Sequence, residues 1–141
     1  MSPKERLQTL AIKELTLSVT TEVPFERIRD LLSCALDSGF SKYWCVVEAY
    51  VTPKVAYQSS GGGTYKHLDY PLSVGGATMV RDEESDGHEK YRLDLESIQR
   101  GLDVMARKYP NDFGSFMAEE EDSHTGDMFL QCCLLGGVLY A

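Results

Sequence analysis

The sequence has no apolar stretch approaching the roughly 20 residues that cross a lipid bilayer. The segment after Met1 also shows neither the hydrophobic region nor the small-residue cleavage site of a secretory signal. We therefore expect a cytoplasmic protein with no membrane partner. With 141 residues, 43% of them hydrophobic and 26% charged, the chain is predicted to form one compact domain over residues 1–141.

Clusters of basic residues are also missing, because the 14 Lys and Arg residues are dispersed along a chain of formal net charge −8. Proteins that bind long nucleic acid usually carry a basic patch, so no such partner is expected. A small phosphate-bearing ligand stays open, since one or two well-placed arginines are enough to hold it. The acidic runs at residues 82–86 and 119–122 are interpreted as solvated loops.

The motifs of metal sites and catalytic centres are absent from the sequence. The cysteines form no C-x-x-C pair, and the histidines belong to no recognisable metal-binding or nucleophile-activating motif. These residues are Cys34, Cys45, Cys132, Cys133, His67, His88 and His124. We therefore expect no metal, no cofactor and no catalytic residue, and we predict that the protein is not an enzyme.

The hydrophobic periodicity predicts an α+β fold, with a mostly antiparallel sheet and helices packed on one face. A helix is expected from near Pro24 to a left-handed Gly39, and another from an Asp94 cap to Pro110. The other predicted elements are strands at 14–19, 43–51, 77–81, 90–93 and 138–140, a short helix at 112–118, and a last helix through 128–135.

Three segments lie outside this regular pattern or have an unusual composition. Residues 1–13 are predicted to be a peripheral arm. Residues 53–76 are predicted to be an irregular, glycine-rich excursion, interpreted as a hairpin tip or a lid, because its three consecutive glycines lack the Gly-Lys-Ser/Thr ending of a phosphate-binding loop. The last helix, with Thr125 and Asp127 expected as N-terminal caps, is apolar on every side, so it is either buried or packed against another subunit.

Two places in the chain are candidates for binding a ligand. Tyr43 and Trp44 follow the Gly39 turn at the start of a predicted strand, where aromatic rings can offer a stacking face to a base. The alternative is that Trp44, the one tryptophan, is the central core residue. Arg81 ends another predicted strand and is placed either to hold a phosphate or to neutralise the neighbouring Asp82 or Glu84.

Four segments, taken in order, resemble a family of small phage and prophage proteins. They are ALDSGFSKYW (35–44), GGATMVRDE (75–83), RLDLESIQRGL (92–102) and TGDMFLQCCLLGGVLYA (125–141). The family pattern runs A-L-E-G-G-x-N-Y-W, a Gly-Gly-rich strand ending in Asp-Glu, T-L-x-x-L-x-x-G-I, and D-A-D-x-x-x-Q-x-A-L-F-G-E-V-V-Y-G. This family is identified as the one that contains phage sponges acting against the Thoeris defence system.

The resemblance implies a non-enzymatic protein that sequesters cyclic ADP-ribose isomers made by bacterial TIR proteins, in the host cytoplasm during infection. It also implies a homo-oligomer built from dimers, with cyclic di- or trinucleotides held at separate sites in some members. Carried over by motif, Tyr43 and Trp44 stack on the adenine, Arg81 meets the diphosphate, and Asp127 bonds a ribose or base edge. The departures at residues 40–42, 53–76 and Gly137 concern the identity of the ligand more than the fold.

Two other functions stay open. One is a protein-binding inhibitor of a host defence complex, similar in kind to anti-CRISPR proteins, whose acidic loops imitate nucleic acid on a basic host surface. The other is an accessory phage protein without a ligand.

Overall fold

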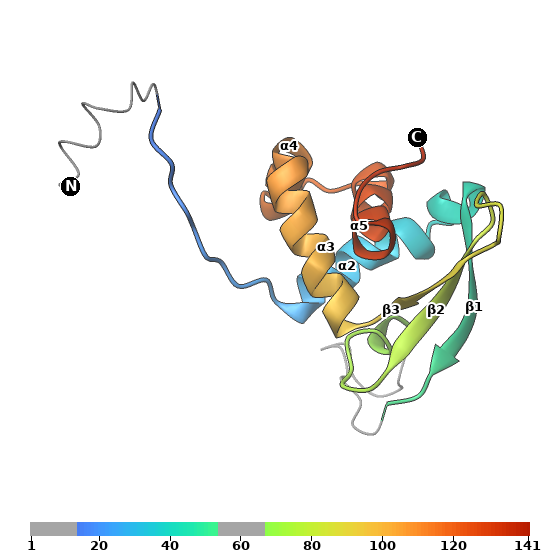
Figure 1. Ribbon diagram of the computed structural model, residues 1–141. Coiled ribbons are helices and arrows are strands. Elements are labelled where there is room, and N and C mark those ends of the chain that lie inside the picture. The colour runs from blue at the N-terminus through green and yellow to red at the C-terminus, as the bar shows by residue number, and fades with distance from the viewer. Residues whose placement is uncertain (1–13, 54–66) are drawn as a thin grey trace, which may run out of the picture.

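The computed structural model describes residues 14–53 and 67–141 (Figure 1). The elements, with η for 3-10 turns, are α2 (Phe25–Leu36), η1 (Phe40–Tyr43), β1 (Cys45–Val51), η2 (His67–Asp69), β2 (Ala77–Asp82), β3 (Lys90–Leu93), α3 (Leu95–Lys108), α4 (Pro110–Met117) and α5 (Ser123–Leu135). The α+β prediction is confirmed for these residues. The predicted arm at 1–13 and the glycine-rich part of the 53–76 excursion lie outside them, and so does its interpretation as a lid.

The three strands form an antiparallel sheet in the order β1-β2-β3. Cys45 pairs with Asp82 and Val51 with Ala77, with a register shift between Val47 and Ala49, while Thr78 of β2 pairs with Leu93 of β3. All four α-helices lie on one side of this sheet in Figure 1. The predicted strands at 77–81 and 90–93, and the helices on one face, are therefore confirmed.

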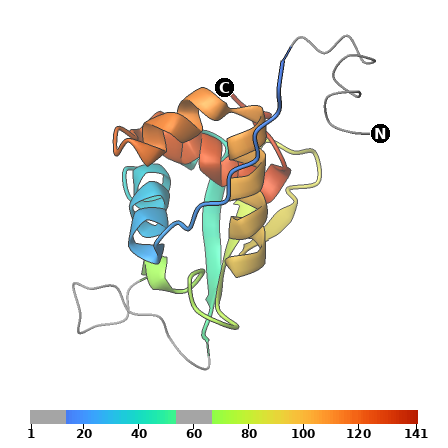
Figure 2. The same cartoon turned by 90° about the vertical axis from the view of Figure 1, so that its left-hand side faces the viewer.

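Helix α5 occupies the centre of the helical layer. In Figure 2, α2 and α3 lie on either side of it, and every residue from Thr125 to Leu134 is buried. Its neighbours on both sides explain why the helix is apolar all round, so the core interpretation of 128–135 is correct for this chain. The close approach of α3 depends on Gly101, because a Cβ built there would lie 2.2 Å from Cys133 Sγ.

Capping boxes fix the starts of α3 and α5. Asp94 accepts a hydrogen bond from the Ser97 amide (3.0 Å), and Asp122 accepts one from the Thr125 amide (2.9 Å). The prediction that Thr125 and Asp127 cap the last helix is therefore wrong. The helix begins at Ser123, so Thr125 is the partner of the cap within the first turn and Asp127 lies inside the helix.

Helix α2 and strand β1 are both shorter than predicted. Gly39 adopts the predicted left-handed conformation (φ 75°), but α2 already ends at Leu36, and Gly39 directs the chain into η1. The strand predicted for 43–51 begins at Cys45, and Cys45 is its one buried residue. The prediction of a largely buried strand is wrong because β1 lies at the edge of the described sheet.

Two predicted strands do not form. Residues 138–140 are held by side chains instead of a strand ladder: the Val138 amide donates to the Tyr109 hydroxyl, and the Leu139 amide donates to the Gln131 side chain (2.9 Å each). Residues 14–19 are extended but exposed and make no strand pairing with the described chain. Period-two alternation therefore identified an extended segment correctly but not its partner.

No helix in the described part of the chain is long and apolar enough to span a membrane.

Replacing Gly101 by alanine tests the contact between α3 and α5. We expect Gly101→Ala to lower the free energy of unfolding by about 1–3 kcal/mol, because the added methyl group overpacks against Cys133. The matched control is Gly114→Ala in α4, where a Cβ meets nothing within 4 Å and the better helix propensity of alanine raises stability by about 0.5–1 kcal/mol. Urea unfolding followed by circular dichroism measures both. Equal stability of the two variants would contradict the close packing of α3 on α5.

Candidate functional site

The side chain of Asp127 is the centre of a buried hydrogen-bond network. Its Oδ1 accepts hydrogen bonds from Ser41 Oγ (2.6 Å) and Trp44 Nε1 (2.8 Å). Its Oδ2 accepts from the Tyr43 hydroxyl (2.7 Å) and from Gln131 Nε2 (3.0 Å). Asp127 is only 2% exposed, and all four donors are neutral groups. These hydrogen bonds replace the water that a carboxylate loses on burial.

Gln131, one helical turn after Asp127, attaches the C-terminal segment to α5. Its Oε1 accepts from the amides of Leu139 and Tyr140 (2.9 Å each), while its Nε2 donates to the Tyr140 carbonyl (2.9 Å). The orientation of the Gln131 amide is thereby fixed, because its oxygen faces two backbone N–H groups.

Tyr140 extends the network toward the sheet. Its ring packs on Trp44 with a centroid separation of 5.6 Å, and its hydroxyl donates to Asp82 Oδ2 (2.8 Å). The other oxygen of Asp82 accepts from the amides of Glu84 and Ser85 (2.9 and 3.1 Å), which holds the turn after β2. We call Ser41, Tyr43, Trp44, Asp82, Asp127, Gln131 and Tyr140 the Asp127 network.

Two of the predicted ligand-binding residues lie inside this network. Trp44 is 0% exposed, so the alternative that it is a core residue is the one the structure adopts. The Trp44 indole N–H donates to Asp127. The Trp44 ring and the Asp127 carboxylate are both buried in this chain. A ligand therefore cannot reach Trp44 for the expected stacking, or Asp127 for the expected ribose contact, from the surface of one copy.

Tyr43 is placed differently, because its hydroxyl joins the network while its ring reaches the surface. Tyr43 is 41% exposed and Phe40 is 42% exposed, and the two rings meet edge to face with centroids 6.1 Å apart. His124, in the first turn of α5, lies on the other side of Phe40 at 6.4 Å. We call Phe40, Tyr43 and His124 the aromatic patch. Burial and the hydrogen bond to Asp127 raise the pKa of Tyr43, so its hydroxyl remains protonated at neutral pH.

Arg81 is not brought together with the other three predicted residues. It neighbours Asp82 along β2, and successive strand residues point to opposite faces of a sheet. Its guanidinium donates to Glu83 (2.7 and 3.0 Å) and to Glu48 on β1 (3.1 Å). Arg81 therefore does form ion pairs with carboxylates, as expected, but its partners are Glu83 and Glu48 and not Asp82 or Glu84.

The described surface has three hollows whose lining includes none of the four predicted ligand-binding residues. The largest, a groove of about 820 Å³, lies between residues 19–23 and helix α3. A hollow of about 230 Å³ includes Arg92 and Arg100, and one of about 150 Å³ includes Val47 and Tyr50. Within residues 14–53 and 67–141, no group of three His, Cys, Asp or Glu side chains is arranged to hold a metal ion.

The sequence analysis missed four members of the network, namely Ser41, Asp82, Gln131 and Tyr140. A signal existed for one of them: Asp127 and Gln131 lie four residues apart in an otherwise apolar helix, so they share a face. No local pattern indicates that Tyr140 packs on Trp44, because that contact joins residues almost a hundred positions apart.

Comparison of the chain with protein-family models, with curated proteins and with solved structures found no match. The resemblance to phage sponges therefore stays a prediction from the four sequence segments.

Removing the charge of Asp127 tests the network. We expect Asp127→Asn to lower the free energy of unfolding by about 1–3 kcal/mol, because one amide orientation opposes the Trp44 N–H and the other opposes the Gln131 N–H. Asp103→Asn is the matched control: this exposed α3 carboxylate accepts one long bond, from Gln99 (3.4 Å), and should change stability by less than about 0.5 kcal/mol. Chemical denaturation measures both, and equal effects would contradict a central role for Asp127.

Alkaline pH provides a second test, through the tyrosines that donate to carboxylates. The hydrogen bond to Asp82 raises the pKa of Tyr140 to about 12, and the bond to Glu89 raises that of Tyr91 to about 12. Because a tyrosine ordinarily titrates near pH ~10, these bonds stabilise the fold fully below that pH, and the stabilisation is lost as pH rises toward 12. Tyrosinate absorbance should show Tyr91 and Tyr140 titrating late, and Tyr140→Phe should remove one late transition. Titration of all eight tyrosines together in the folded protein would contradict these contacts.

Proposed function

We propose that this protein is a non-enzymatic sponge that binds a cyclic ADP-ribose isomer, or a related cyclic di- or trinucleotide, and holds it unchanged in the cytoplasm of an infected host. The proposal starts from the resemblance of four sequence segments. The observation that supports it is their convergence: residues of 35–44, 75–83 and 125–141 share the Asp127 network, and Gly101 of 92–102 packs on Cys133.

The aromatic patch is the part of this region that is suited to a nucleobase. Stacking of a base on an aromatic ring contributes on the order of 1–3 kcal/mol. The hydrogen bond from the Tyr43 hydroxyl to Asp127 holds the ring in place before a ligand arrives, which lowers the entropy lost on binding. In this proposal Tyr43 contacts the base, while Trp44 and Asp127 are positioning residues.

Arg81 is the proposed phosphate contact. Its ion pairs with Glu48 and Glu83 lie at the surface, where such pairs contribute little to stability and can be exchanged for a phosphate. Lys90, opposite Arg81 on β3, also contacts Glu48 (3.2 Å) and adds a second cation. Arg81 bonds to Glu48 and Glu83 and not to the aromatic patch, so in this proposal a ligand that touches both is shared between two copies of the homo-oligomer.

The alternative of a protein-binding inhibitor that imitates nucleic acid is less well supported, because many carboxylates of the acidic runs bond within their own chain. Glu83 pairs with Arg81, Glu121 pairs with Arg27, and Asp122 caps α5. Asp82 is buried. Fewer free carboxylates therefore remain in these runs for a basic host surface than the sequence suggests.

Native mass spectrometry of the purified full chain tests the sponge directly. The protein is measured alone and with a panel of cyclic ADP-ribose isomers and cyclic oligonucleotides. We expect a ligand-shifted oligomer that releases the same compound, unaltered, on denaturation. Release of a cleaved product would contradict a sponge, and an unshifted spectrum across the panel would favour the ligand-free or protein-binding alternatives.

Substitutions in the two proposed contacts give a residue-level prediction. We expect Tyr43→Ala and Arg81→Gln each to weaken binding of the retained compound at least about tenfold, equivalent to ~1.4 kcal/mol. The matched controls are Tyr50→Ala, which removes a tyrosine of similar exposure (44%) from the far end of β1, and Arg100→Gln, which removes an exposed arginine paired with Glu96. Isothermal titration calorimetry measures affinity, and circular dichroism checks the fold. Equal affinities of variants and controls would contradict the assigned contacts.

A further inference from the structure

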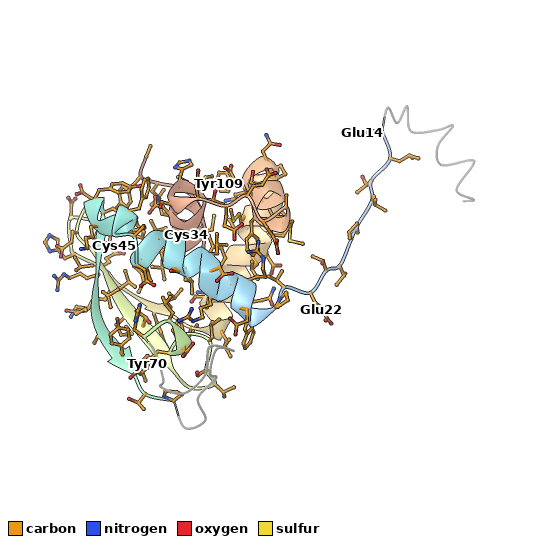
Figure 3. The ribbon with its side chains drawn as sticks, turned by 180° about the vertical axis from the view of Figure 1, so that it is seen from behind. Glu14, Glu22, Cys34, Cys45, Tyr70 and Tyr109 are labelled. Carbon is orange, nitrogen blue, oxygen red and sulfur yellow. The ribbon has the colours of Figure 1, made fainter. Side chains whose placement is uncertain are left out.

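The segment before α2 has the pattern of a strand but no partner. Residues 14–22 follow the predicted peripheral arm at 1–13, and we call them the N-terminal arm. They form an extended chain that lines a groove with residues 19–22 and then runs away from the body (Figure 1); Figure 3 labels the two ends, Glu14 and Glu22. Leu15, Leu17 and Val19 alternate with polar residues and are 80%, 84% and 76% exposed. No backbone hydrogen bond joins the arm to another described residue. Three large apolar side chains on one side of an extended segment are typical of a surface that is covered in the functional assembly.

Local sequence keeps the arm extended. Val23 precedes Pro24, which restricts Val23 to extended backbone, and Pro24 itself enters α2 at φ −60° and ψ 146°. Residues 19–21 and Val23 are β-branched, which also favours extended backbone, and residues 15–23 contain none of the Gly, Pro, Asn or Asp residues typical of turns. The arm therefore lacks a hinge that would reverse it onto the body of its own chain.

An apolar groove lies at the base of the arm. It has a volume of about 820 Å³ and is bounded on one side by the last arm residues and on the other by α2, α3 and α4. The apolar residues that line it from the helices are Phe25, Ile28, Leu95, Ile98, Leu102, Ala106 and Phe113. We call this hollow the arm groove. It offers an apolar surface of the kind that the Leu15 and Leu17 side of an arm requires.

We propose that two copies of this chain exchange their N-terminal arms, so that Leu15 and Leu17 of each copy lie in the arm groove of the other, whose wall includes that copy's own Val19. A reciprocal exchange uses the same two surfaces on both copies and closes as a twofold dimer. It does not depend on a nucleotide ligand.

Charge complementarity favours a second copy as the occupant. Residues 1–13 carry three basic residues and one acidic residue, whereas the rest of the chain carries 11 basic and 21 acidic residues. In the sequence the arm joins the acidic body to this basic segment, and beyond the groove-lining residues 19–22 its described part runs away from the body (Figure 1). An acidic surface of another copy is therefore a favourable partner for the segment that the arm carries.

Sedimentation velocity of the full chain over a range of concentrations tests the exchange. We expect a dimer whose dissociation constant rises at least tenfold in the arm variant Leu15→Ser/Leu17→Ser, which leaves the groove residue Val19 unchanged. The control variant Val74→Ser/Leu139→Ser removes two other largely exposed apolar side chains (72% and 67%) and should leave the dimer unchanged. Circular dichroism should show the same fold in all three proteins, because every substituted side chain is exposed.

A mixing experiment separates exchange between copies from an arm that folds onto its own groove. The groove variant Ala106→Glu places a charge in the arm groove, so it should be monomeric, as should the arm variant. Mixed in equal amounts, the two should form a heterodimer that is weaker than the wild-type dimer, because one of the two reciprocal contacts, an intact arm in an intact groove, is kept. Failure of the mixture to associate, a monomeric wild-type chain at every concentration, or a dimer that survives the arm substitutions would each overturn the proposal.

Discussion

The structure depends on one buried carboxylate, that of Asp127, whose four hydrogen-bond donors are all neutral groups. The Asp127 carboxylate accepts hydrogen bonds from three side chains of residues 41–44, namely Ser41, Tyr43 and Trp44, and from Gln131 on its own helix α5. Because an unpaired buried carboxylate is costly, η1 is fixed against the middle of α5. That position in turn fixes the Trp44 ring, on which Tyr140 packs, and through Tyr140 the turn after β2. One buried carboxylate thus couples the segment before β1 to α5, to the C-terminal residues and to the turn after β2.

The same constraint divides the predicted binding residues into two groups. Trp44 and Asp127 are buried, while the Tyr43 hydroxyl donates to Asp127 and the Tyr43 ring is exposed at the surface. Arg81 lies on the opposite face of β2 and is held by Glu48 and Glu83. For this reason the function proposed above places Tyr43 and Arg81 of two different copies on one ligand. The exposed arm and its groove point to association through a different surface, so the two proposals can succeed or fail separately.

The elements that sequence reasoning predicted well are those whose causes are local. Asp94 and Pro110 bracket α3 because a capping carboxylate and a missing amide act within one helical turn. Gly39 adopts positive φ because it has no Cβ. The strands β2 and β3 follow from β-branched and alternating residues on either side of a polar turn. Asp122 was overlooked as the cap of α5 because several polar residues precede that helix, and which one bonds the Thr125 amide is a matter of geometry.

The amino-acid sequence was enough to predict the α+β class, an apolar last helix and the extended character of residues 14–19. Tertiary contacts were needed for three further facts. Trp44 lies in the core, Arg81 pairs with Glu48 and Glu83, and residues 138–140 bond to side chains. Periodicity reports which residues share a face, since it follows from backbone geometry alone. It carries no information on which distant segment covers that face. The partners of Asp127 in residues 41–44 lie more than 80 residues away, and the packing of the whole chain brings them together.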